Sequence, residues 1–349
     1  LFTKLMEATF KRHLLKLKVP GGTSRGVLME KETWFLFLKD GLKRGIGECA
    51  VFRGLSSDDR PDYEIQLKLL CNQINMNNKV SLEILKNFPS IQMGYEMAVL
   101  SLNGKNSFEL FPSKFTDGNE SIPINGLIWM GEIDFMKAQI KQKIDEGFDC
   151  LKLKIGALSF EKELELLSEI RNEFSKDEMI IRVDANGGFS PDDVMDKLNK
   201  LANLDIHSIE QPIKANQRKR MSSICSKTPV PIALDEELIG VFDPLDRENL
   251  LDQVSPQYII LKPSLLGGFK SCEHWIELAE QRSIGWWVTS ALESNIGLNA
   301  IAQWTYQLGI SSHQGLGTGG LFTNNIDSPL HVKLGKLRFN INSCWNTKF

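Results

Sequence analysis

Five charged residues in the second half of the chain recur at intervals of one strand and one helix. Each closes or directly follows a short apolar run, and successive members lie roughly 25 to 30 residues apart, about the length of one βα unit. A single acid after a strand is usually a helix N-cap or a surface residue. Five in register are better explained by one shared site, built from Lys154, Asp184, Glu210, Asp235 and Lys262.

The three acidic members of this set predict a site for a divalent cation. Carboxylates that converge on one point repel each other unless a cation neutralises them. All-oxygen ligation suits Mg²⁺, which keeps coordination positions open for water or substrate oxygens. Histidine and cysteine are absent from the set, which argues against zinc.

The basic members predict proton transfer. Lys152 and Lys154 are two residues apart in one strand, so they face the same way. A lysine with the reference pKa of about 10.4 is protonated at neutral pH, but burial and a neighbouring cation lower that pKa to about 7–8 in catalytic lysines. Removing the α-proton of a metal-bound carboxylate creates an enediolate, which the metal and Lys152 would stabilise. Lys154 and Lys262, from opposite sides of a barrel, could serve elimination, cycloisomerisation or racemisation.

The chain from residue 122 onward alternates short apolar runs with helical stretches, which predicts βαβ units and a parallel sheet of the α/β class. The count reaches about eight strands, the number that closes a (β/α) barrel. The expected strands are 125–130, 150–155, 179–183, 208–209, 231–234, 258–261, 286–289 and 311–313. A doubly wound open sheet is the alternative, although no glycine-rich dinucleotide turn follows the first strand.

The remaining sequence predicts a second domain beside the barrel. Residues 1–121 are typical of an α+β capping domain, residues 122–320 form the barrel, and the strand-like tail 321–349 is expected to return to the cap. In the cap we expect strands at 9–17 and 33–38 and helices at 62–75 and 90–102. Segment 21–26 is expected to be a mobile surface loop, because no Lys-Ser or Lys-Thr follows its glycines as in a phosphate-binding loop.

Composition excludes several classes of partner. The formal net charge is −3, which argues against nucleic acid, and no apolar stretch is long enough for a membrane span or a signal peptide. Hydrophobic residues make up 42% of the chain, enough for a sizeable core. The six cysteines form no C-x-x-C pair, so we expect a cytoplasmic protein without disulfides.

The motifs K-x-K, D-A-N, E-Q-P, D-E and K-P, in this order, resemble the enolase superfamily in its muconate-lactonising branch. The resemblance covers nearly the whole chain and implies a (β/α)7β-type, TIM-like barrel with a capping domain. It implies Mg²⁺, with Mn²⁺ as a substitute, held by Asp184, Glu210 and Asp235. It also implies a small carboxylate substrate and catalytic roles for the lysines. Lys154 would be the acid/base, Lys152 its electrostatic helper and Lys262 the lysine on the opposite face. A homo-oligomer stays open, because the sequence does not give the oligomeric state.

Within that branch the chain is most similar to the o-succinylbenzoate synthases, which eliminate water from a cyclohexadiene carboxylate in menaquinone biosynthesis. The similarity lies in the loop 22–26, in Arg182, in the segment 289–294 and in the glycine-rich segment 315–319. Backbone N–H groups of the last segment could hold a succinyl carboxylate. The implied substrate contacts are Ser24, Arg182, Asn186, Ser290, Glu293 and Gly317, with Glu236 orienting Lys262 or the metal ligands.

Two other functions stay open at this point. An N-succinylamino acid racemase can use the same residues, and a barrel that has lost its chemistry could serve as a binding module. Dipeptide epimerases place Asp-x-Asp at the last strand, where this chain has Ser311-Ser312-His313, and mandelate racemase relatives use a histidine base where it has Trp287-Val288-Thr289. His313 is a weaker candidate near the expected barrel mouth.

Overall fold

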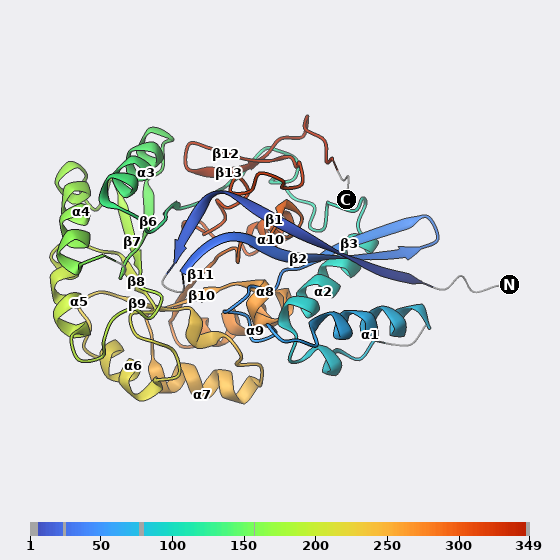
Figure 1. The fold of residues 1–349 in the computed structure, drawn as a ribbon, viewed down its shortest axis with the longest axis horizontal. Coiled ribbons are helices and arrows are strands. Elements are labelled where there is room, and N and C mark those ends of the chain that lie inside the picture. Colours follow the sequence, from blue (N-terminus) through green and yellow to red (C-terminus); the bar gives the residue numbers. More distant parts are fainter. Residues whose placement is uncertain (1–5, 24–25, 77–79, 157, 347–349) are drawn as a thin grey trace.

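The computed structural model describes residues 6–23, 26–76, 80–156 and 158–346. An antiparallel sheet with its helices forms one part of the molecule, and a ring of parallel strands surrounded by helices forms the other (Figure 1). Across the described residues, no helix is both long and apolar enough to cross a bilayer.

The N-terminal sheet has three strands in the order β1 (Glu7–Thr23), β2 (Gly26–Asp40) and β3 (Lys43–Cys49). Alternate residues of β2, among them Trp34 and Leu36, are buried against α1 (Tyr63–Asn75) and α2 (Pro89–Asn103), with the short helix η1 (Leu82–Leu85) between these two in the chain. The sequence does not predict β3, because its two glycines weaken the strand pattern. A Cβ on Gly47 would lie 1.8 Å from the carbonyl oxygen of Gly94, so glycine allows α2 to approach the sheet.

The expected surface loop at 21–26 is mostly strand. Gly21, Gly22 and Thr23 pair with Leu28, Val27 and Gly26, so β1 and β2 form one long ribbon. Gly22 also forms a bridge to Met130, which brings the ribbon against the parallel ring. The prediction was wrong because a glycine pair suggests a loop, whereas here it permits this close approach.

The second part contains a seven-stranded parallel sheet in sequential order. Its strands are β5 (Gly126–Ile128), β6 (Cys150–Lys154), β7 (Ile180–Asp184), β8 (Ser208–Glu210), β9 (Ile232–Leu234), β10 (Tyr258–Leu261) and β11 (Gly285–Val288). The surrounding helices are α3 (Ile133–Asp145), α4 (Phe160–Glu173), α5 (Val194–Ala202), α6 (Arg218–Cys225), α7 (Pro244–Val254), α9 (Phe269–Glu280) and α10 (Asn295–Gln307), with short turns η2 (Glu236–Leu238) and α8 (Pro263–Leu266).

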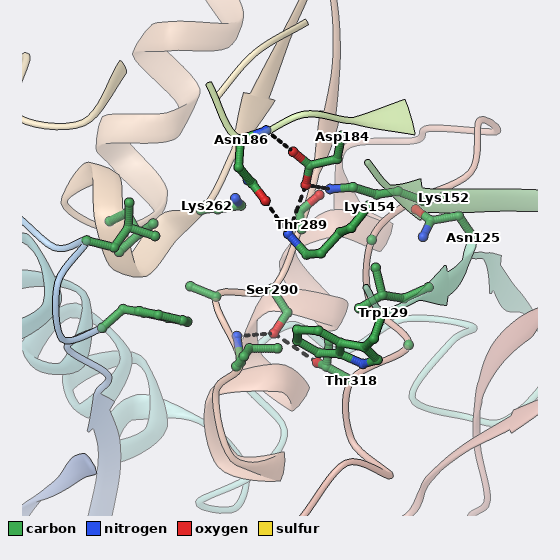
Figure 2. A pocket seen from close by; sticks show the side chains of 18 residues that line it. Asn125, Trp129, Lys152, Lys154, Asp184, Asn186, Lys262, Thr289, Ser290 and Thr318 are labelled. Carbon is green, nitrogen blue, oxygen red and sulfur yellow. Dashed lines mark hydrogen bonds and ion pairs between the residues drawn. The ribbon is translucent and has the colours of Figure 1, made fainter. Parts of the chain in front are cut away.

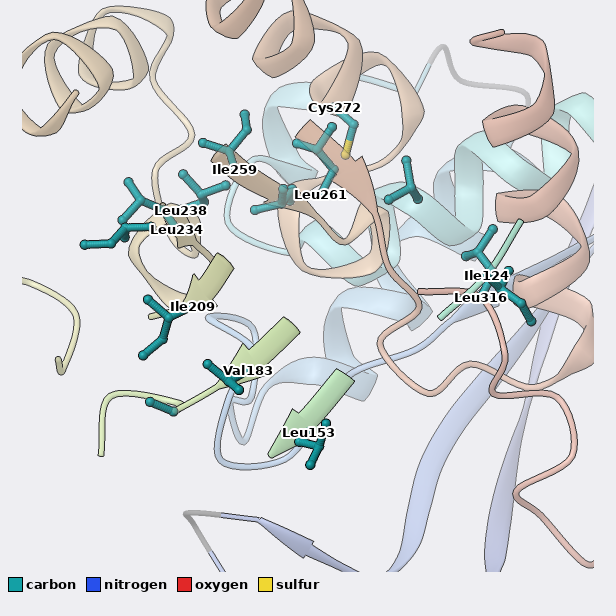
Figure 3. Packing of buried hydrophobic residues seen from close by; sticks show 14 of the residues in the cluster. Ile124, Leu153, Val183, Ile209, Leu234, Leu238, Ile259, Leu261, Cys272 and Leu316 are labelled. Carbon is teal, nitrogen blue, oxygen red and sulfur yellow. The ribbon is translucent and has the colours of Figure 1, made fainter. Parts of the chain in front are cut away.

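The side chains of the parallel strands alternate between two environments. Leu153, Val183, Ile209 and Leu261 face outward and belong to the main hydrophobic cluster beneath the helices (Figure 3). Residues one position away face the interior of the ring. The charged residues at the strand ends fall in that inward set: Lys152, Lys154, Asp184, Glu210, Asp235 and Lys262.

Two isolated parallel bridges close the ring. Gln314 pairs with Ile124 beside β5, and Gly315 pairs with Thr289 beside β11. The eighth strand is thus reduced to two residues that follow the expected 311–313. The barrel prediction is confirmed, and the open-sheet alternative is wrong.

The tail contacts both parts of the molecule. Leu321 accepts a backbone hydrogen bond from Lys18 of β1, and Thr323 donates one to Lys16. Further on, β12 (Leu330–Lys333) and β13 (Lys336–Phe339) form a hairpin whose second strand pairs with β4 (Ser121–Pro123), just before the barrel begins. The boundaries at 121/122 and 320/321 stay predictions.

Candidate active site

Strand register brings the five predicted residues to one end of the barrel. Lys154, Asp184 and Glu210 are direct partners across β6, β7 and β8. Asp235 and Lys262 immediately follow β9 and β10. All five therefore lie at the carboxyl ends of adjacent parallel strands, where barrel enzymes place their active sites.

The charged groups form two neighbouring sets of buried ion pairs, one around Asp184 and Glu210 and one between Lys262 and Asp235. The Nζ atom of Lys152 lies 3.1 Å from Asp184 Oδ2 and also donates to Glu210 Oε2. Lys154 Nζ lies 3.1 Å from the same Asp184 oxygen, and Lys262 Nζ donates to Asp235 Oδ2. The side chains of the acids are at most 2% exposed. Such a set is stable only if every charge has a partner.

The environment shifts the pKa values of two of the buried carboxyl groups in opposite directions. Burial raises the pKa of Glu210 to about 7, and the charges of Asp184 and Asp235 add to this rise against the opposing effect of Lys152. For Asp184, burial acts the same way, but attraction to Lys152 and Lys154 outweighs it and lowers the pKa. The carboxylates are therefore close enough to repel each other, as the sequence predicted.

Lys152 and Lys262 do not show the lowering of the pKa that is expected of catalytic lysines. Burial acts to lower the pKa of Lys152, but Asp184, Glu210 and Asp235 raise it above its ordinary value. The pKa of Lys262 is also raised, since attraction to Asp235 outweighs burial and repulsion from Lys152. For both amines, attraction to the carboxylates outweighs the effect of burial. A divalent cation on those carboxylates would remove this effect.

The acidic residues fit Mg²⁺ by their chemistry and by one unsatisfied atom. Within the described ranges, no three His, Cys, Asp or Glu side chains already converge as a ready metal site, because lysine amines occupy oxygens of all three acids. Glu210 Oε1, however, is buried and accepts no hydrogen bond. A buried carboxylate oxygen left over beside two further carboxylates matches the all-oxygen ligand set of Mg²⁺.

The charged set forms one wall of a pocket of about 760 Å³, including its open mouth. Lys152, Lys154, Asp184 and Lys262 line that wall (Figure 2). Facing sides are largely apolar, and Ser290 and Thr318 lie across the pocket from Asp184. The apolar residues are Phe52 and Leu55 from the N-terminal part and Leu127, Trp129, Leu265, Ala291 and Leu292 from the barrel.

Three of the other predicted residues line this pocket. Asn186 accepts a hydrogen bond from Lys154 Nζ at 2.7 Å and donates one to Glu236 Oε1 at 3.1 Å, so Glu236 acts on Lys154 through Asn186. Ser290 and Gly317 also line it. Ser24 lies outside the described residues.

Two predicted substrate contacts do not line the pocket. Arg182 lies deeper in the barrel, with its guanidinium 4.1 Å from the ring centroid of Trp287 and a hydrogen bond to the carbonyl oxygen of His313. Glu293 is fully buried and accepts hydrogen bonds from Ser264 and Ser290. The resemblance implied contact with the substrate in both cases, but strand position and protein partners direct these side chains elsewhere.

His313 is also displaced from the expected barrel mouth. Its Nε2 atom lies 2.8 Å from Asp149 Oδ1, just before β6 begins, at the amino ends of the strands. The register was wrong because the closing bridges fall one and two residues later, at Gln314 and Gly315.

The sequence-based set misses several pocket residues. Asn125, Thr289 and Thr318 line the pocket, and the side-chain oxygens of Asn125 and Thr289 are buried without a hydrogen-bond partner. Asn125 and Thr289 flank barrel strands, a signal that could have identified them. Phe52 and Leu55 come from the N-terminal part, and no sequence pattern marks them.

Comparisons with known proteins agree with this geometry. Residues 135–339 match the family model described as enolase C-terminal domain-like. The chain is 46% identical to o-succinylbenzoate synthase of Desulfotalea psychrophila, with 95% of this chain and 98% of that protein covered.

Solved structures give the same grouping. MenC from Desulfotalea psychrophila LSv54 superposes with a TM-score of 0.86 at 42% identity, covering 95% of this chain and 99% of that one. Muconate lactonizing enzyme from Pseudomonas fluorescens shares the fold, with a TM-score of 0.82 at 22% identity over 99% and 97% of the two chains. The family model and the extended sequence identity together show that this chain belongs to the enolase superfamily.

Proposed function

We propose that this chain is an o-succinylbenzoate synthase, which eliminates water from 2-succinyl-6-hydroxy-2,4-cyclohexadiene-1-carboxylate in menaquinone biosynthesis. The observation that carries the proposal is the pocket in which lysines from β6 and from the end of β10 flank three buried carboxylates. The 46% identity to the synthase of Desulfotalea psychrophila supports the choice of substrate.

Asp184, Glu210 and Asp235 would hold Mg²⁺, and the same oxygen ligands would accept Mn²⁺ as a substitute. When bound, the cation supplies positive charge at the substrate carboxylate, where negative charge develops as the neighbouring proton leaves. Lys152 adds a fixed positive charge at this end of the pocket. Its contacts with two of the acids keep it oriented there.

Lys154 carries the proton in this proposal. As a neutral amine it takes the proton from the carbon next to the carboxylate, and as an ammonium it returns that proton to the leaving hydroxyl, which departs as water. One group performs both transfers, so the proton and the hydroxyl leave from the same face. Asn186, held by Glu236, fixes the Nζ atom through its 2.7 Å hydrogen bond.

The opposite end of the pocket suits the second carboxylate of the substrate. Ser290 and Thr318 are joined by a hydrogen bond of 2.9 Å and line the pocket across from the charged wall. The apolar wall between the two polar ends can cover the ring. Lys262, from another strand than Lys154, remains a cation on the other face of the ring.

The proposed compartment is the reducing cytoplasm. The cysteines Cys49, Cys71, Cys150, Cys225, Cys272 and Cys344 are all free thiols, which is typical of such a compartment.

An ultraviolet assay for the aromatic product tests the proposed function directly. The purified chain is incubated with the cyclohexadiene substrate and Mg²⁺, then with excess EDTA, then with Mg²⁺ restored. We expect product only when the metal is present. Failure to form product under any metal condition would reject the synthase assignment.

Racemisation of an N-succinylamino acid is the second candidate, favoured by the presence of Lys154 and Lys262 on separate strands. Incubation of a single enantiomer in D₂O would reveal it as deuterium at the α-carbon with loss of optical rotation. Measuring both reactions on one preparation gives the ratio of the two activities.

A further inference from the structure

Two fully buried glutamates outside the charged wall meet at the loop that follows β11. Glu293 is 0% exposed and Glu48, from the N-terminal sheet, is 1% exposed. Neither lines the pocket, and the proposed chemistry uses neither. A buried carboxylate costs stability unless several donors satisfy it, so their partners show what they hold in place.

Glu293 binds the pocket-facing part of the loop. Its Oε2 accepts hydrogen bonds from Ser290 Oγ at 2.6 Å and from the backbone N–H of Ala291 at 2.8 Å. Its Oε1 accepts one from Ser264 Oγ, at 2.5 Å, in the turn after Lys262. The carboxylate therefore ties Ser290 to the strand end that carries a catalytic lysine.

Glu48 binds the other end of the loop from across the interface. Its two oxygens accept hydrogen bonds from the N–H of Ser294 at 2.8 Å, from Ser294 Oγ at 2.5 Å and from the N–H of Gly297 at 2.8 Å. Ser294 is the N-cap of α10, so Glu48 places a negative charge at the start of that helix. Thr33 orients the same carboxylate through a hydrogen bond of 2.8 Å.

The two glutamates also meet at Gly297. A Cβ there would lie 2.8 Å from Glu48 Oε2 and 2.8 Å from Glu293 Cβ, so glycine leaves the room in which both side chains approach. The amine of Lys31 is buried as well. Burial lowers the pKa of Lys31, and attraction to Glu48, Glu293 and Asp58 acts against that lowering.

The backbone is strained between the residues that Glu293 holds and those that Glu48 holds. Leu292 has a φ of 62°, in the left-handed region that a branched residue rarely adopts, and its side chain lines the pocket. Such a conformation costs about 1–3 kcal/mol and persists only where surrounding contacts determine it. Here these contacts include Glu293 on one side and Glu48 on the other, besides the hydrogen bond from the Leu292 N–H to Ser290 Oγ and the packing of the Leu292 side chain with Leu15 and Phe322.

We infer that Glu48 and Glu293 are positioning residues that together hold segment 289–294 in its pocket-lining conformation and so determine how well the substrate end distant from the metal ligands is bound. The N-terminal part thereby shapes substrate recognition through the barrel loop as well as by covering the pocket. This inference rests on the proposed function only for the identity of the substrate.

The test compares Glu293→Ala, Glu293→Gln, Glu48→Ala and Glu48→Gln with a matched control. Glu96 of α2 provides it, because its carboxylate accepts hydrogen bonds from the N–H groups of Phe269 at 2.7 Å and Lys270 at 3.3 Å at the start of α9. Glu96→Ala therefore removes an equivalent contact between the two parts without touching segment 289–294.

We expect each alanine variant at 48 and 293 to raise KM for the cyclohexadiene about tenfold and to leave kcat within about threefold. The glutamine variants keep an acceptor oxygen and should recover most of the loss, and Glu96→Ala should leave KM unchanged. An unchanged KM in Glu293→Ala, or an equal rise in the control, would overturn the inference. If an alanine variant fails to fold, Ser264→Ala, which removes one contact to Glu293, should still raise KM about twofold to threefold.

Hydrogen exchange gives a readout that needs no turnover. Amides of 289–297 should exchange about tenfold faster in the alanine variants at 48 and 293, and only those near 269–270 should do so in the control. If the wild-type protein shows no dehydratase activity, the proposed function is rejected. The hydrogen exchange of residues 289–297 still tests the inference in that case. Unchanged exchange at 289–297 would reject the inference even in an active synthase.

Discussion

Charged side chains lie both at the mouth of this barrel, where the strands end, and at its floor, where the strands begin. The two ends differ in the partners that stabilise these charges. At the mouth, lysines and carboxylates pair with one another and face a pocket. At the floor, Arg182 stacks on Trp287, and His207 stacks on Tyr258 with ring centroids 5.3 Å apart. The floor groups are enclosed by aromatic rings and do not line the pocket. An ionisable residue inside a barrel therefore indicates chemistry only when its depth along the strand is also known.

The largest expected effect is at the mouth. Lys154→Ala should reduce turnover by about 10²–10⁴-fold, the usual contribution of a general acid/base, while circular dichroism and the melting temperature change little. Lys137, which pairs with Glu169 on the outer helices, offers a control in which alanine leaves turnover unchanged. Substantial residual activity in Lys154→Ala would assign the proton transfer to another group.

The next effect concerns the cation at the mouth. Mg²⁺ at about 100 times its Kd should stabilise the wild-type protein by about 2.7 kcal/mol, seen as a higher melting temperature. Glu210→Gln should lose most of this stabilisation because a ligand charge is gone, whereas Glu96→Gln should keep it. Equal Mg²⁺ stabilisation in the two variants would place the metal elsewhere.

A substitution at the floor should lower the stability of the protein and leave substrate binding nearly unchanged. Arg182→Met retains volume but removes the contact with Trp287 and the hydrogen bond to His313, so denaturant unfolding should show a loss of about 1–2 kcal/mol. KM should stay within about twofold of the wild-type value. A large rise in KM without loss of stability would restore Arg182 as a substrate contact.

The smallest expected effect is the dependence of the free energy of unfolding on pH through His207, at the floor of the barrel. Burial, with the charge of Arg182 and then that of His313, lowers the pKa of His207 from 6.5 to about 4. The unfolded chain therefore binds the proton more readily, and the contribution to stability, complete above pH 6.5, is lost as pH falls toward 4. Between pH 7 and 5 the wild-type protein should lose about 1 kcal/mol more than His207→Gln, allowing for partial exposure. Parallel losses in urea titrations of both proteins would contradict this.

The sequence predicts those site residues that recur once in each βα unit of the barrel. Asp184, Glu210 and Asp235 follow apolar runs at one βα spacing, so local pattern and closed topology together place them at one end. Arg182 obeys the same alternation, since it lies two residues before Asp184 and also points inward. Its interior face was predictable, whereas its aromatic partner on β11, more than a hundred residues away, was not.

The remaining errors share a physical cause. Phe52 and Leu55 reach the pocket only because the two parts of the molecule pack together, which no local pattern encodes. Glu293 lies in a recognisable motif, but its role depends on Ser264 and on the neighbouring anchor at Glu48. Contacts between distant segments decide these roles, and a single sequence gives their residue types without their partners.

The two bridges that close the barrel have a consequence for the folding of the newly synthesised chain. They join Ile124 to Gln314 and Thr289 to Gly315, so the edge beside β5 stays unpaired until some 190 further residues have been synthesised. Until then, both edges of the growing sheet can recruit strands from other chains. Nascent chains that stop short of Gln314 should therefore aggregate readily, and the last few residues to join the ring should control how much soluble protein a cell obtains.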